Sequence, residues 1–142
     1  MEVEREAGNT STTEGWVMIA KEREHVKNEH FVKVTTLLKQ ARPRLATTYQ
    51  LTFNNVFGAV GGYVNGHIFV SCGRFGVALR LPSKVLEDLF KDKGVKHLKY
   101  FPNGHIKKEY AVIPKRIIEN KQQFKKLLDK SIEYSFRREA SK

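Results

Sequence analysis

The chain has 142 residues, of which 40% are hydrophobic and 29% are charged, and its net charge is +11. This length and composition fit one folded domain and exclude both a disordered chain and two ordinary domains. No apolar run approaches the roughly 20 residues that cross a bilayer, and a single cysteine, Cys72, excludes an internal disulfide.

Residues 1–28 are predicted to form an N-terminal extension that is partly disordered, because residues 1–14 are polar and include a run of Ser and Thr. A short apolar segment begins at Trp16. From about residue 29, apolar residues recur at the spacing of an amphipathic helix: Val34, Leu37, Leu38 and Ala41. Pro43 ends this helix, since proline lacks the backbone N–H. The folded domain is predicted to span residues 29–138, followed by a tail at 139–142.

Strand-like alternation follows the helix, because Tyr49, Leu51 and Phe53 alternate with polar residues. Asn54-Asn55 is a turn signal. Asn65-Gly66 is a stronger signal, because a two-residue hairpin needs a positive φ at both positions. It is expected to join strands at 60–64 and 67–72. A further reversal at Gly73-Arg74 precedes a strand over 75–81.

The C-terminal half returns to helical patterns. A helix is predicted to begin at Pro82-Ser83, with strands near 95–101 and 107–113, a helical turn at Pro114 and a last helix over 121–136. The inner side of that last helix is predicted to carry Phe124, Leu127, Leu128, Ser131 and Ser135. The order is helix, three to four strands, helix, two strands, helix. It predicts an α+β fold in which an antiparallel sheet is covered on one face by helices.

Several motifs resemble the TfoX N-terminal domain-like family, which occurs alone or at the start of bacterial TfoX/Sxy competence regulators. The resemblance covers about residues 31–138. It implies the fold α-β(3)-α-β(2)-α, similar to secretion chaperones and YjbR-like proteins, and a structural role for the glycine-rich motif of Gly58, Gly61, Tyr63, Asn65 and Gly66. One departure is Ala59, where many members have a second glycine. The matching residues are Val56-Phe57-Gly58, Gly61, Tyr63, Asn65-Gly66, Phe69, Arg80-Leu81, Lys108-Glu109-Tyr110 and Pro114.

No pattern in the chain indicates catalysis, a metal or a cofactor. The glycine-rich segment lacks the Lys-Ser/Thr pair of a P-loop and the following helix of a dinucleotide site. His25 and His30 would point apart on a helix. Cys72 and His67 are five positions apart in one predicted strand, and therefore on opposite faces. We expect a protein that is not an enzyme, with no cofactor and no metal site.

The basic residues concentrate in the C-terminal part, where residues 91–142 carry fifteen Lys or Arg against six Asp or Glu. A basic surface attracts nucleic acid by counterion release, although it also simply keeps a protein soluble. The candidate DNA or RNA contacts are Lys107, Lys108, Lys126, Lys130 and Arg137. The last three lie in one sector of the predicted C-terminal helix, as the residues of any solvated helix face would.

The sequence therefore predicts a cytoplasmic, non-enzymatic regulatory or protein-interaction module, without the second domain of full-length competence regulators. The alternative is a basic nucleic-acid-binding protein that uses the Lys/Arg-rich C-terminal half. The expected partner is a second copy of the chain or another protein, because a single sheet has edges that must be blunted or paired. Nucleic acid is the other candidate partner, and no membrane partner is expected.

Overall fold

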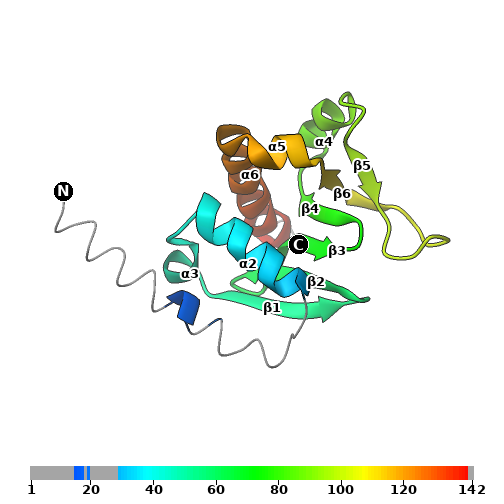
Figure 1. Cartoon of the computed structure of the whole chain (residues 1–142). Helices are drawn as coiled ribbons and strands as arrows, with labels where there is room; N and C mark the ends of the chain where they lie inside the picture. Colours follow the sequence, from blue (N-terminus) through cyan, green and yellow to red (C-terminus); the bar gives the residue numbers. More distant parts are fainter. Residues whose placement is uncertain (1–14, 18, 20–28, 141–142) are drawn as a thin grey trace.

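The computed structural model describes residues 15–17, 19 and 29–140, with side chains up to Arg137 (Figure 1). The predicted disorder at 1–14, His25 and the end of the predicted tail lie outside the described residues. The elements are α2 (Glu29–Ala41), α3 (Leu45–Thr48), β1 (Leu51–Val56), β2 (Ala59–Val64), β3 (His67–Gly73), β4 (Gly76–Arg80), α4 (Ser83–Phe90), β5 (Lys96–Leu98), β6 (Lys107–Ile113), α5 (Lys115–Glu119) and α6 (Lys121–Ala140).

The six strands form one antiparallel sheet in the order β1-β2-β3-β4-β6-β5, which confirms the predicted α+β class. The first group holds four strands rather than the three of the order α-β(3)-α-β(2)-α. The short helix α3 is additional, and the short helix α5 begins directly after Pro114, where a helical turn was predicted. Among the described helices, none combines the length and the apolar character needed to cross a membrane.

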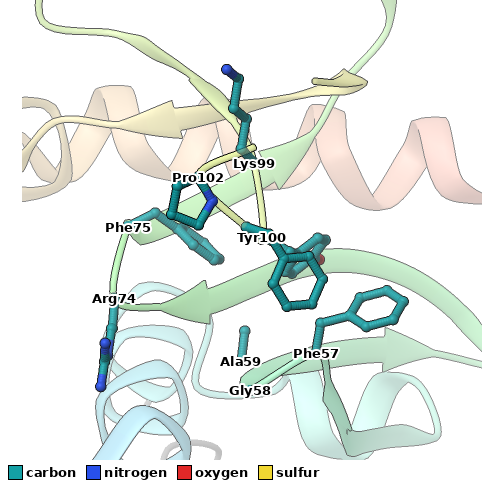
Figure 2. Close-up of a pocket in the computed structure, with 9 residues that line it drawn as sticks. Phe57, Gly58, Ala59, Arg74, Phe75, Lys99, Tyr100 and Pro102 are labelled. Atoms are coloured by element: carbon teal, nitrogen blue, oxygen red, sulfur yellow. The ribbon is translucent and has the colours of Figure 1, made fainter. Parts of the chain in front are cut away.

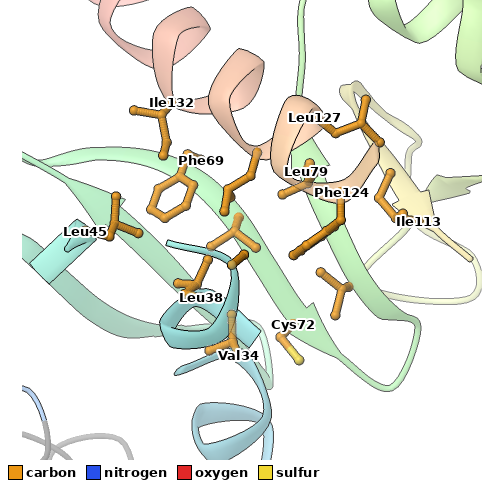
Figure 3. Packing of buried hydrophobic residues seen from close by; sticks show 14 of the residues in the cluster. Val34, Leu38, Leu45, Phe69, Cys72, Leu79, Ile113, Phe124, Leu127 and Ile132 are labelled. Atoms are coloured by element: carbon orange, nitrogen blue, oxygen red, sulfur yellow. The ribbon is translucent and has the colours of Figure 1, made fainter. Parts of the chain in front are cut away.

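The main core lies between the sheet and helices α2, α4 and α6, which pack on one face (Figures 1 and 3). Leu38 of α2, Leu79 of β4 and Leu128 of α6 are at most 1% exposed. Alternate residues of a strand point to opposite faces. Ala78 and Val112, each next to core residues in its strand, therefore point away from the helices. They form a smaller cluster with Leu98 on that face.

The serines predicted on the inner side of α6 hydrogen-bond to β3. The pairing of β2 with β3 shifts between Gly62 and Tyr63, which leaves Phe69 as an extra residue on β3. Ser131 Oγ donates to the carbonyl oxygen of Phe69 at 2.6 Å, and Ser135 Oγ donates to that of Ile68 at 2.9 Å. Helix α6 therefore supplies hydrogen bonds to β3 where the pairing of β2 with β3 is irregular.

The hairpin turns differ in two places from the prediction. The reversal predicted at Gly73-Arg74 lies one residue later, at Arg74-Phe75, because Gly73 still pairs with Gly76. Asn65-Gly66 forms the predicted turn, with φ of 49° and 86°. The β1–β2 turn is not at Asn54-Asn55 but at Phe57-Gly58, with φ of 49° and 82°. Pairing between β1 and β2 continues to Val56 and Ala59, so that both asparagines lie within β1. The turn forms where a glycine lies two positions after the last paired residue, Val56, and Phe57 between them must then adopt a positive φ.

Part of the N-terminal extension packs against the domain. Trp16 and Ile19 are buried in the main core, at 6% and 5% exposure. The indole Nε1 of Trp16 donates a hydrogen bond of 2.8 Å to the carbonyl oxygen of Pro43, just after α2. The described part of the extension is therefore attached to the region between α2 and α3.

Candidate functional site

Three connections at one end of the sheet surround a depression of about 560 Å³, which we call the aromatic hollow (Figure 2). They are the β1–β2 turn, the β3–β4 turn and the segment 99–106 between β5 and β6. The lining residues are mostly aromatic or basic: Phe57, Gly58, Ala59, Arg74, Phe75, Lys99, Tyr100, Phe101 and Pro102.

The aromatic rings of the hollow contact one another across these connections. The ring centroid of Phe57 lies 5.4 Å from that of Tyr100 and 5.7 Å from that of Phe101. Phe75 meets Tyr100 edge to face at 5.8 Å. These distances are those of favourable aromatic pairs. The four rings therefore form one cluster that links three turns distant in sequence.

Two of these rings face solvent to an unusual degree, since Phe57 is 63% exposed and Phe101 is 54% exposed. Phe57 also has a φ of 49°, a conformation that costs a bulky residue free energy and that asparagine or glycine would adopt more readily. Phe57 therefore combines an exposed ring with a strained turn position.

Tyr100 anchors the 99–106 segment on the sheet. Its hydroxyl lies 3.0 Å from Ser71 Oγ, and Ser71 is fully buried in β3. The strand predicted at 95–101 is wrong in length, because β5 ends at Leu98. After Leu98 the chain turns Tyr100 onto the face away from the helices, next to Ala78 and Val112. This anchor positions the exposed Phe101.

The charges around the aromatic hollow are all positive. Lys107 Nζ lies 5.9 Å from the centroid of the Tyr100 ring, a cation–π geometry. Figure 2 shows Lys99 above the rings and Arg74 at the side beyond Phe75, with their charged ends pointing away from the rings. The stretch 93–108, which includes β5 and the segment after it, contains five lysines, two histidines and no acidic residue. The hollow therefore favours an anionic ligand.

Tyr100 of the hollow and two further tyrosines, Tyr63 and Tyr110, are held in their neutral form. Burial raises the pKa of Tyr63 and Tyr100, and it raises the pKa of Tyr110 most strongly. The phenol groups also raise one another's pKa, because two phenolates would repel. At neutral pH these side chains contribute neutral rings and hydroxyl groups rather than charge.

The five predicted nucleic-acid contacts do not form one surface. Lys107 lies at the aromatic hollow, and Lys108 is its exposed neighbour in β6. Lys126, Lys130 and Arg137 are exposed on α6, which covers the opposite face of the sheet. The α6 surface also carries acidic residues, and Arg137 Nε lies 3.8 Å from Oε1 of Glu133. The structure thus separates the predicted set into two groups.

The residues of the glycine-rich motif take structural positions. Gly58 and Gly66 occupy turns with φ of 82° and 86°. Asn65 Oδ1 accepts a hydrogen bond of 2.9 Å from the backbone N–H of Gln50. A Cβ on Gly61 would lie 3.2 Å from the Tyr63 hydroxyl oxygen, so the absent side chain leaves room for that tyrosine to lie flat on the sheet.

The remaining candidates for chemistry are not assembled into a site. Cys72 is completely buried in the main core, and burial raises the pKa of its thiol. His67, on the same strand, has its ring 5.7 Å from that of Phe136 on α6. Within the described ranges, no three His, Cys, Asp or Glu side chains lie together as a metal site would require.

No protein-family model matches the sequence, and no curated protein matches it. The structure adds functional candidates that the sequence analysis did not select: Arg74, Phe75, Lys99, Tyr100 and Phe101. A signal was present, because the adjacent Tyr100 and Phe101 stand in a stretch rich in lysine and free of acidic residues, before Pro102. That combination indicates an exposed aromatic loop rather than a buried strand.

Proposed function

We propose that the chain is a non-enzymatic regulatory or interaction module of the type found in the TfoX N-terminal domain-like family, and that it binds a macromolecular partner through the aromatic hollow. The observation that supports this most is the state of Phe57. Its ring is 63% exposed, contacts Phe101 and occupies a turn position with a φ of 49°. Backbone strain and exposed aromatic rings concentrate at binding surfaces.

The distribution of exposed apolar side chains supports the same surface. Five large apolar side chains of the described residues are exposed, and Phe57, Phe101 and Ile106 belong to the connections at this end of the sheet. Aromatic rings such as those of Phe57 and Phe101 are usual anchors of interfaces, because they bury a large area with few rotatable bonds. The basic residues beside them would supply a charged rim.

The buried tyrosines and the buried cysteine favour binding over catalysis. A general base or a nucleophile needs a pKa close to the operating pH. Burial instead raises the pKa values of Tyr63, Tyr100, Tyr110 and Cys72, so these groups hold their protons more tightly. The tyrosines then act as donors and as flat apolar surface.

Self-association is a second candidate, favoured by the edge strand β1. Leu51–Val56 pairs with β2 on one side and is the terminal strand of the sheet. An edge of six residues offers backbone groups to a second copy. Light scattering over a wide concentration range should show dimers, whereas a monomer at every concentration would exclude this mode.

Site-specific photo-cross-linking tests the proposed surface. A benzophenone amino acid replaces Phe57 in one variant and Val32 in another, because Val32 is similarly exposed, at 54%, but lies on α2. In cells that make the protein, we expect discrete adducts from position 57, lost when Phe101→Ala is added, and none of these adducts from position 32. Equal labelling from both positions would reject the aromatic hollow as the binding surface.

A further inference from the structure

We infer that the aromatic hollow binds single-stranded nucleic acid, with bases stacked on Phe57 and Phe101 and phosphates next to Arg74, Lys99 and Lys107. This inference rests on the proposed function, because it names the chemistry of the partner at the same surface. It also moves the predicted nucleic-acid contacts away from α6.

The exposed rings fit the faces of unpaired bases. Proteins that bind single strands combine aromatic side chains, on which bases stack, with cations that follow the backbone. Phe57 and Phe101 are more than half exposed, and their ring centroids are 5.7 Å apart. Bases within a duplex already stack on one another, so these rings select a strand whose bases are free.

The arrangement of cations fits a polyanion that passes across the rings. Arg74 lies beyond Phe75 at one end of the aromatic cluster, Lys99 lies above the rings (Figure 2), and Lys107 lies over Tyr100. No lining residue is acidic. An acidic peptide would satisfy these charges, but it would bring few flat rings for Phe57 and Phe101. Charge and ring geometry together therefore favour a nucleic acid over an acidic protein.

The α6 surface lacks this combination. Its cations Lys126, Lys130 and Arg137 alternate with Asp129 and Glu133 along the helix. Asp129 binds Arg42, with Oδ1 accepting from Arg42 Nε at 2.9 Å, and Glu133 lies near Arg137. As a whole α6 carries six Lys or Arg against three Asp or Glu, but none of its described aromatic side chains is exposed beside these cations.

Fluorescence anisotropy with a labelled 15-nucleotide strand, oligo-dT or oligo-U, tests the inference at several salt concentrations. We expect binding at low salt, weakened about 10-fold by Phe57→Ala or Phe101→Ala, since stacking contributes a factor of about this size per base. Lys99→Glu/Lys107→Glu should weaken binding further and lower the salt dependence, because fewer counterions are released. The charge-matched control Lys126→Glu/Lys130→Glu should change affinity by less than about 2-fold, and circular dichroism checks that each variant folds.

Three outcomes would overturn the inference: no binding of either oligonucleotide at low salt, equal loss from the two double variants, or equal affinity for a duplex of the same length. The cross-linking experiment separates this failure from that of the proposed function. If position 57 gives discrete adducts that resist nuclease and the oligonucleotides do not bind, the partner is a protein and only the nucleic-acid inference fails. If cross-linking from position 57 is no more specific than cross-linking from position 32, the proposed function and the nucleic-acid inference both fail.

Discussion

The hydroxyl oxygens of Ser71 and Tyr100 lie 3.0 Å apart on the sheet face that carries no helix. Ser71 is in the middle of β3, and Tyr100 is in the segment between β5 and β6. This hydrogen bond fixes the 99–106 segment to the sheet. It thereby positions Phe101 beside Phe57 and determines the shape of the aromatic hollow.

Tyr100→Phe should loosen this segment without removing the ring. The substitution leaves the buried Ser71 hydroxyl without this partner, which costs about 1–2 kcal/mol of unfolding free energy. We expect faster amide exchange in residues 99–106 and an unchanged exchange rate in α6. Ser71→Ala/Tyr100→Phe should recover part of the lost stability, because neither polar group then remains; a further loss would show that the two hydroxyls do not interact.

Phe57→Asn should leave the protein as stable as before or slightly more stable. Asparagine adopts a positive φ more readily, which raises the free energy of unfolding by about 1 kcal/mol. The lost ring contacts lower it by a similar amount. Chemical denaturation measures the difference. A loss of more than about 2 kcal/mol would mean that Phe57 stabilises the fold rather than serves an interface. Phe53→Ala is the control, since this core ring is 6% exposed and its removal costs about 3–5 kcal/mol.

Ser131→Ala should destabilise the protein by about 1–3 kcal/mol, because the carbonyl oxygen of Phe69 then loses a hydrogen bond in the interior. The exposed Thr36→Ala is the matched control. Thr36 Oγ1 bonds the carbonyl oxygen of Val32 within the solvated side of α2, so its removal should cost less than about 0.5 kcal/mol. Similar losses in the two variants would contradict the role assigned to Ser131.

Periodicity predicted the elements of the fold well. The helical spacing of Val34, Leu38 and Ala41 led to α2, which ends at Ala41, two residues before Pro43. The inner side of α6 was also predicted correctly, because apolar side chains and small serines share one stripe there. These features are local and repeat over several turns or positions, and the physics of burial therefore determines them directly.

The candidate site was not predicted, because it depends on contacts between distant turns. Phe57, Phe75 and Tyr100 lie far apart in the sequence, and only the strand order brings them together. Phe57 is at a turn position that sequence rules assign to glycine or asparagine, and the Asn54-Asn55 signal was therefore preferred. Tyr100 and Phe101 fit a strand by composition, although the chain leaves the sheet after Leu98.

Gly66→Val should destabilise the β2–β3 hairpin by about 1–3 kcal/mol. Gly66 has a φ of 86°, which a β-branched residue adopts only with strain. There is open space around a Cβ at this position, so the loss would report backbone conformation rather than a clash. Thermal melting is sufficient to detect it. The control Asn54→Val, at an exposed and regular position of β1, should change the stability by no more than about 0.5 kcal/mol. Equal losses in Gly66→Val and Asn54→Val would contradict the positive-φ turn at Gly66.

The buried tyrosines predict a loss of stability in alkali. Burial raises the pKa of Tyr110 well above the ordinary tyrosine value of about 10, and it raises the pKa of Tyr63 and Tyr100 in the same direction. As the pH rises, the unfolded chain therefore loses these protons before the folded protein does. The stabilisation is complete below about pH 10 and falls above it, because the folded state then binds more protons than the unfolded state. Denaturation at pH 8 and pH 10.5, with phenolate absorbance recorded in parallel, should show this fall and a smaller one in Tyr110→Phe. An identical fall in that variant would mean that other groups cause the alkaline loss.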